Sequence, residues 1–111
     1  MIQHIGPQQA LEIIRSGNVD VVDVRELHEW SGGHVQESRL VPLGQLRSSP
    51  SASLPKDGIL FICAAGVRSE TAARLAVGLG FKTVYNLRGG TRAWANAQLP
   101  LESDDPIAAA I

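Results

Sequence analysis

Short apolar runs recur along the chain, and four of them have the residue pattern of β-strands. β-branched residues dominate 19–24, and shorter apolar runs occupy 39–43 and 82–86. The run at 58–62 is apolar on both alternating faces, which is typical of a central strand in a parallel sheet. We therefore expect strands at these four positions.

The segments between these runs predict helices and one loop. Pro7 suits the first turn of a helix that ends near 16–18, and a short helix is expected at 26–30. Another helix is expected to carry Trp94. The segment 48–55 is rich in serine and proline, so we expect a loop there.

A longer helix is predicted after residue 69, because apolar residues recur there at helical spacing: Ala72, Leu75, Ala76 and Leu79. Gly80 can terminate this helix. Strands that alternate with helices indicate an α/β fold, in which helices cover both faces of a mostly parallel sheet. In such sheets, ligands bind beyond the carboxyl ends of the strands.

The chain has 111 residues, of which 44% are hydrophobic, so it is expected to form one domain with a packed core. We expect the domain to span 1–100 and an acidic tail, mobile or loosely docked, to span 101–111. The net charge of −1 indicates neither a nucleic-acid nor a membrane partner. Residues 63–100 are locally basic, which fits an anionic substrate and scattered surface charge equally well.

The single cysteine, Cys63, cannot form an internal disulfide. The three histidines lack metal-ligand spacing with Cys63, so neither a metal nor another cofactor is expected. The N-terminus lacks the pattern of a signal peptide, and no apolar stretch is long enough to span a bilayer. We therefore expect the protein in the cytoplasm, where a free thiol survives.

Cys63 is the most informative residue, because it lies between the apolar run at 58–62 and the longest predicted helix. Small or apolar residues lead from it to Arg68 and Ser69. Such a loop can direct backbone N–H groups at one point beside a helix N-terminus, which stabilises an anion and lowers the pKa of a thiol. Cys63 is therefore predicted to be a nucleophile, although an inert core thiol would also fit its apolar flank.

The residues after Cys63 have separate predicted roles. Gly66 is expected to allow a positive φ or a close backbone approach. Arg68 either binds an anion or holds the loop through hydrogen bonds to carbonyl groups, and both roles stay open. Ser69 is expected to cap the following helix.

Four ordered segments resemble the rhodanese family of thiosulfate sulfurtransferases, in particular its single-domain members. They are Asp23-Val24-Arg25 with Glu29-Trp30 and Gly33-His34-Val35; Val41-Pro42-Leu43; Cys63 to Ser69; and Leu87-Arg88-Gly89-Gly90 with Ala93-Trp94. Each segment alone is a weak signal, but their order and spacing between His4 and Pro100 make the resemblance specific.

Two positions depart from the family pattern. Glu37-Ser38 stands where Gly-Ala is common, and the neutral Ala64-Ala65 lacks the basic residues of some thiosulfate-using members.

The resemblance implies a rhodanese-like fold with about five strands and a ping-pong transfer of sulfur. The Cys63 thiolate would take sulfur from a small anionic donor such as thiosulfate, hold it as a persulfide, and pass it to cyanide or a thiol, including a protein thiol. Asp23 and Arg25 would form a buried pair that supports the loop, and His34 would be structural. The residues expected to bind the substrate and the persulfide anion are Ala64, Ala65, Gly66, Val67, Arg68 and Ser69.

Other functions fit parts of the same pattern. The domain could be a persulfide carrier for a partner protein, or an inactive structural module, although the presence of Cys63 and Arg68 disfavours the latter. A related phosphatase or arsenate reductase would place its arginine six positions after the cysteine, whereas Arg68 is five positions after Cys63. The shorter loop favours a single transferred sulfur over a tetrahedral oxyanion.

Overall fold

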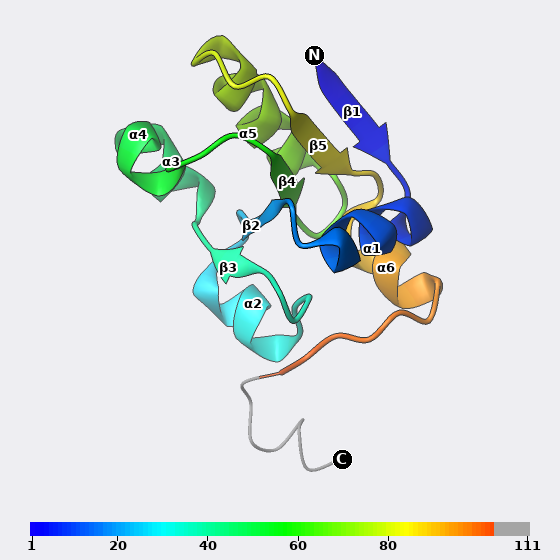
Figure 1. Cartoon of the computed structure of the whole chain (residues 1–111). Coiled ribbons are helices and arrows are strands. Elements are labelled where there is room, and N and C mark those ends of the chain that lie inside the picture. The colour runs from blue at the N-terminus through cyan, green and yellow to red at the C-terminus, as the bar shows by residue number, and fades with distance from the viewer. Residues whose placement is uncertain (104–111) are drawn as a thin grey trace.

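A computed structural model of the chain describes residues 1–103, which form five strands and six helices (Figure 1). The strands are Ile2–Ile5 (β1), Asp20–Asp23 (β2), Arg39–Leu40 (β3), Ile59–Ile62 (β4) and Val84–Leu87 (β5). The helices are Pro7–Ser16 (α1), Leu27–Gly32 (α2), Leu43–Ser48 (α3), Pro50–Ser53 (α4), Val67–Gly78 (α5) and Gly90–Asn96 (α6). None of the helices within residues 1–103 is long and apolar enough to cross a membrane.

The five strands form one parallel sheet in the order β1-β5-β4-β2-β3 (Figure 1). β4 lies in the centre between β5 and β2, and all four of its residues are buried. A strand with partners on both edges and helices over both faces meets apolar surroundings everywhere, so its run of Ile, Leu, Phe and Ile is unbroken. The predicted α/β fold with a parallel sheet is confirmed.

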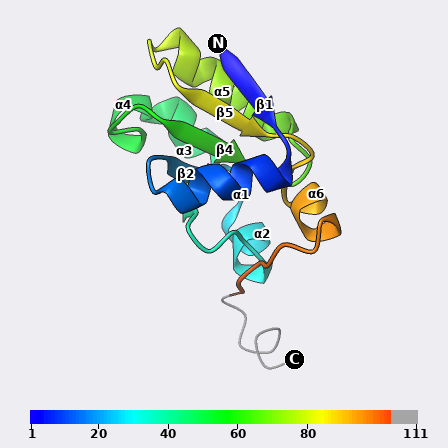
Figure 2. The same cartoon turned by 45° about the vertical axis from the view of Figure 1, so that its right-hand side comes forward.

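The sheet separates two hydrophobic cores, and alternate residues of each strand enter one or the other. Figure 2 shows α1 in front of the sheet and α5 behind it. Phe61 of β4 packs in the core on the α5 side, together with buried residues of α3 and α5. Leu60 and Ile62 pack on the opposite side, where α1 and Trp94 of α6 complete the core. Cys63 continues the alternation from Phe61 and therefore belongs to the α5 side.

Three elements differ from the sequence prediction. β1 was not predicted, because it is an edge strand whose middle residues, Gln3 and His4, are exposed and polar. The loop expected at 48–55 is wrong in part, because Pro50 starts the one-turn helix α4. The strand expected at 39–43 is only two residues long, because Pro42 has no N–H for the ladder and α3 starts after it.

The first residues of the expected acidic tail are docked on the domain. The backbones of Glu102 and His34 exchange two hydrogen bonds, of 2.7 and 2.8 Å, and the Ser103 hydroxyl donates to the Ser31 carbonyl. The division of the chain at residue 100 stays a prediction, and the rest of the expected tail, 104–111, lies outside the described residues.

Candidate active site

Cys63 lies immediately after β4, at the carboxyl end of the central strand, as the sequence predicted. It is 1% exposed. Residues 63–66 form a short turn that leads into α5, and we call residues 63–69 the cysteine loop. The thiol is thus covered by its own loop and lies beside the N-terminus of the longest helix.

Two groups of the cysteine loop contact the sulfur directly. The Gly66 N–H donates to Cys63 Sγ at 3.0 Å, and the Ser69 hydroxyl lies 3.2 Å from Sγ. Burial raises the pKa of the thiol. The backbone N–H groups of Ser69, Ala65 and Gly66, together with the hydroxyl of Ser69 when its proton faces the sulfur, outweigh burial and hold the pKa below its usual value. The loop can therefore stabilise a negative charge on sulfur.

The N-terminus of α6 holds the cysteine loop in this shape. The Thr91 N–H donates to the Cys63 carbonyl at 2.8 Å, and the Arg92 N–H donates to the Ala64 carbonyl at 3.1 Å. With these carbonyls bound to α6, the following N–H groups are free to face the sulfur. Gly90 makes the contact possible, because a Cβ on it would overlap the Cys63 carbonyl oxygen and the Ala64 carbonyl group.

Gly66 has φ +98°, which confirms the positive φ expected from the sequence. It is also the N-cap of α5, so the prediction that Ser69 caps this helix is wrong. Ser69 lies inside the first turn of α5, is fully buried, and donates its hydroxyl to Asn86 Oδ1 at 2.5 Å. Its side chain therefore contacts the sulfur of Cys63 and Asn86 of β5, and it does not cap the helix.

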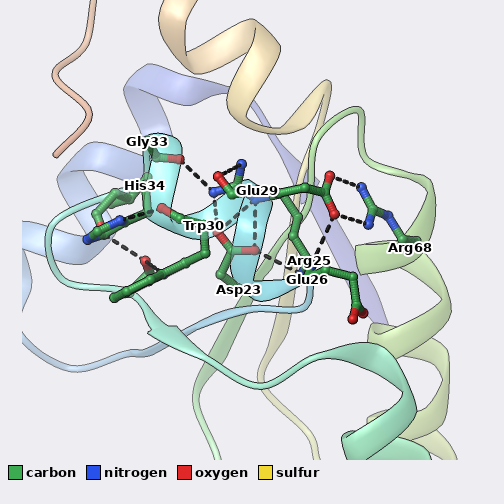
Figure 3. Close-up of polar contacts among 10 residues, drawn as sticks. Asp23, Arg25, Glu26, Glu29, Trp30, Gly33, His34 and Arg68 are labelled. Atoms are coloured by element: carbon green, nitrogen blue, oxygen red, sulfur yellow. Dashed lines mark hydrogen bonds and ion pairs between the residues drawn. The ribbon is translucent and has the colours of Figure 1, made fainter. Parts of the chain in front are cut away.

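Arg68 is paired with a residue that the sequence analysis did not single out as functional. Its Nη1 and Nη2 atoms donate to Glu29 Oε1 and Oε2 at 2.7 and 2.8 Å (Figure 3). This pairing lowers the pKa of Glu29 to about 2. The guanidinium thus links the start of α5 to α2. Of the two roles left open for Arg68, the carbonyl contacts are replaced by this carboxylate pair, and binding of an anionic substrate stays a prediction.

Asp23 and Arg25 form the buried pair expected from the sequence, with Arg25 Nη2 donating to Asp23 Oδ2 at 2.8 Å (Figure 3). The same nitrogen donates to the Gly33 carbonyl at 2.7 Å, and Nη1 donates to the Glu29 carbonyl. The pair therefore fixes both ends of α2. Its connection to the cysteine loop runs through Glu29 and Arg68.

His34 follows α2 and contacts Trp30 and Glu102. Its ring stacks on Trp30 with centroids 3.6 Å apart, and Nδ1 lies 2.7 Å from the Trp30 carbonyl (Figure 3). It is buried beside the strand-like bridge to Glu102. Within residues 1–103, no group of three or more His, Cys, Asp or Glu side chains is placed to hold a metal ion.

Sequence reasoning missed three residues that shape the site: Glu29, Asn86 and His4. Glu29 occupies the third position of a capping box with Glu26, and that local pattern gives no hint of Arg68, which is 39 positions away. Asn86 is a buried polar residue in an otherwise apolar strand, which is a usable signal of a specific hydrogen-bond partner. His4 lies on the strand that was not predicted.

The comparisons with known proteins agree with this geometry. A family model described as Rhodanese-like domain matches residues 6–97. The chain is 31% identical over 101 residues to the thiosulfate sulfurtransferase GlpE of Pseudomonas putida. This match covers 91% of the chain and 91% of GlpE. It is 36% identical over 77 residues to YrkF of Bacillus subtilis, a protein named as a sulfur carrier; this match covers 69% of the chain and 42% of YrkF.

A solved structure has the same fold. The rhodanese-related protein of Thermoplasma volcanium superimposes with a TM-score of 0.80 at 28% identity, over 90% of this chain and 97% of that one. The family match covers most of the chain, and the GlpE match extends over nearly all of both proteins. Cys63 lies at the carboxyl end of a central strand, where ligands bind in parallel α/β sheets. The chain belongs to the rhodanese-like domain family.

Proposed function

We propose that the protein is a sulfurtransferase that carries sulfur as a persulfide on Cys63. The Cys63 thiolate attacks the outer sulfur of thiosulfate or a similar small anionic donor. The new bond joins Sγ to that sulfur, the S–S bond of the donor breaks, and sulfite leaves with the bonding electron pair. A thiol or cyanide then attacks the outer sulfur and releases the thiolate.

One observation carries this proposal: the sulfur of Cys63 is held by hydrogen-bond donors at the end of the central strand, with the loop carbonyls bound to α6. A thiolate and a persulfide are both anions, so the same donors can stabilise both covalent states. No separate general base is needed for a thiol whose pKa is already lowered. The proposed compartment is the cytoplasm, where a reducing environment keeps this thiol free.

A persulfide carrier for a partner protein is the second candidate. It is favoured by the similarity to YrkF and by the exposure of Val67, which is 74% exposed beside the N-cap of α5. An exposed apolar side chain at the rim of the cysteine loop suits contact with a protein surface better than contact with thiosulfate alone. Steady-state turnover with thiosulfate and cyanide separates the candidates, because a carrier would form the persulfide but turn over slowly.

The decisive experiment is intact mass spectrometry after incubation with thiosulfate and removal of the excess reagent. We expect the mass to increase by one sulfur atom, cyanide to reverse the increase, and Cys63→Ser to abolish it. Arg74→Ala is a suitable control, because Arg74 is an exposed residue of α5 that pairs only with Glu70 among the described residues. An unmodified wild-type protein that still reacts with iodoacetamide would rule out thiosulfate as the donor.

A further inference from the structure

A chain of side-chain hydrogen bonds connects Cys63 to the edge of the sheet. From Cys63 Sγ it passes to Ser69 Oγ at 3.2 Å, and from Ser69 Oγ to Asn86 Oδ1 at 2.5 Å. Asn86 Nδ2 continues it to His4 Nδ1 at 3.1 Å. His4 and Asn86 are register partners on the neighbouring strands β1 and β5, so both side chains lie on the face that α5 covers.

The number of protons limits which hydrogen bonds in this series can exist together. A hydroxyl has one proton, and Ser69 gives it to Asn86 Oδ1 in the arrangement described. The Ser69 oxygen can then only accept from Cys63, so this arrangement suits a neutral thiol. Asn86 directs its oxygen at Ser69 because its Nδ2 donates to His4 Nδ1, which must be unprotonated to accept.

A thiolate requires the opposite arrangement. It needs the Ser69 proton for itself, and Asn86 Oδ1 would then face an oxygen lone pair at 2.5 Å. A half-turn of the Asn86 amide exchanges Oδ1 and Nδ2 and removes this conflict, at the expense of the 3.5 Å contact of Nδ2 with the Gly66 carbonyl. After the half-turn, Asn86 Nδ2 donates to Ser69, and Oδ1 requires a proton on His4 Nδ1.

We infer that His4 is a positioning residue whose protonation turns the Asn86 amide and the Ser69 hydroxyl so that Cys63 becomes a better stabilised thiolate. The inference deepens the proposed function and rests on it, because the thiolate is the form that would attack the donor. The half-turn forms no covalent bond. The thiol proton leaves to solvent, and His4 takes its own proton from solvent, which its side chain reaches at 42% exposure.

The charged groups around His4 are compatible with this role. Glu70 of α5 lies 3.9 Å from His4 Nε2, so a proton on Nε2 faces a carboxylate in both arrangements. Glu70 is itself paired with Arg74 one turn along α5. Arg88, which follows β5, donates to the His4 carbonyl at 2.9 Å and so contacts the backbone of His4. The Glu70 carboxylate favours a proton on Nε2, and a second proton on Nδ1 then gives an imidazolium, which donates to Asn86 Oδ1 more strongly than a neutral imidazole does.

The sign of the effect follows from these arrangements. When His4 is protonated, the Ser69 hydroxyl donates to the sulfur and the thiol ionises more easily. When His4 is neutral, the Ser69 hydroxyl donates to Asn86 and the thiol ionises less easily. The protein would thus keep part of its thiolate at pH values where a simple cysteine would have lost it.

The test is the rate of Cys63 alkylation by iodoacetamide between pH 5 and 9, which measures thiolate without any sulfur donor. We expect His4→Gln to lower the rate near pH 6 by about threefold to tenfold, because a neutral amide donates to Asn86 Oδ1 more weakly than an imidazolium does. His28→Gln on the exposed face of α2 is the matched control and should follow the wild-type profile. A His4→Gln profile identical to the wild type would overturn the inference.

A second variant separates the hydrogen-bond chain from simple attraction between charges. Ser69→Ala leaves the charge of His4 in place but removes the hydroxyl that connects Asn86 to the sulfur. The difference between His4 and Gln at position 4 should vanish in this background, whereas its persistence would show direct attraction and refute the chain. A persulfide test that fails while His4→Gln still alters alkylation would count against the proposed function and leave this inference standing.

Discussion

At the scale of single residues, the chemistry of Cys63 depends on donors that oppose the cost of its burial. Because these donors hold the pKa of the thiol below its usual value, Cys63 has a larger thiolate fraction at neutral pH than an unperturbed cysteine, and this thiolate is lost as pH falls through the lowered pKa. We expect the alkylation rate to have a midpoint below about 8.5, the value of a free cysteine. The same protein in concentrated urea serves as the reference. A folded-state midpoint at or above the unfolded one would contradict the expectation.

The guanidinium of Arg68 pairs with the carboxylate of Glu29 and is also expected to attract an anion that enters the site. With a side chain 36% exposed, it can still reach an incoming donor. We predict that Arg68→Ala raises the KM for thiosulfate by more than it lowers kcat, because an anion contact contributes to binding. Arg74→Ala, on the exposed face of the same helix, controls for the loss of a positive charge. An unchanged KM would assign Arg68 to structure.

The pairing of Glu29 with Arg68 also makes a pH-dependent contribution to stability. The pKa of Glu29 is lowered to about 2 from 4.5, so its contribution is complete above pH 4.5 and disappears as pH falls toward 2. For a partly exposed pair we expect about 1 kcal/mol. Urea unfolding of the wild type and Glu29→Gln should show this difference at pH 7 and almost none near pH 2. A difference that does not shrink in acid would show that the pairing is not its cause.

At the scale of secondary-structure elements, the site depends on the contact between α6 and the cysteine loop. A methyl group at Gly90 would occupy the space of the Cys63 and Ala64 carbonyl groups, and its φ of +60° also disfavours other residues. We predict that Gly90→Ala abolishes persulfide formation and lowers the melting temperature by several degrees.

Gly78→Ala is the matched control for Gly90→Ala. Gly78 lies in α5, and a methyl group added there would meet no atom within 4 Å outside the neighbouring helix backbone. The variant should gain up to about 1 kcal/mol of unfolding free energy, because alanine is the better helix former. Persulfide formation by Gly90→Ala at the wild-type level would mean that α6 does not control the loop.

The elements were predictable where one local pattern dominates. The unbroken apolar run of β4 and the small apolar residues of α5 identify a buried strand and the helix that follows it. β1 gives no such signal, because an edge strand buries only Ile5 fully and exposes Gln3 and His4. Ser69 was placed at the wrong helix position, because Gly66 with its positive φ caps the helix three residues before Ser69 would.

At the scale of the whole molecule, the chain closes on itself through the segment after α6. Backbone bonds between Glu102 and His34, and the bond from Ser103 to Ser31, hold this segment against the loop after α2. We predict that a chain ending at Pro100 loses about 1–2 kcal/mol of unfolding free energy relative to one ending at Ser103, as measured by urea unfolding. Equal stability of the two chains would show that these bonds are matched by water.

Contacts between distant segments set the limit of what the sequence could predict about the site. Cys63 and its loop form one continuous segment with its own pattern, so the candidate nucleophile could be proposed from the sequence. Glu29 and Asn86 act through partners 39 and 17 positions away, and nothing in their own neighbourhoods indicates which partner the fold brings to them. Their roles emerge only when the sheet order is known.

The sheet order has a consequence for the order in which the protein is made. β1 leaves the ribosome before the other four strands, yet its strand partner within residues 1–103 is β5, and His4 meets Asn86 across 82 positions of sequence. Cys63 is synthesised well before β5 and α6, which complete its surroundings. A nascent chain that lacks β5 and α6 therefore lacks the contacts with Asn86, Thr91 and Arg92, and the surroundings of Cys63 are complete only after α6 has been translated.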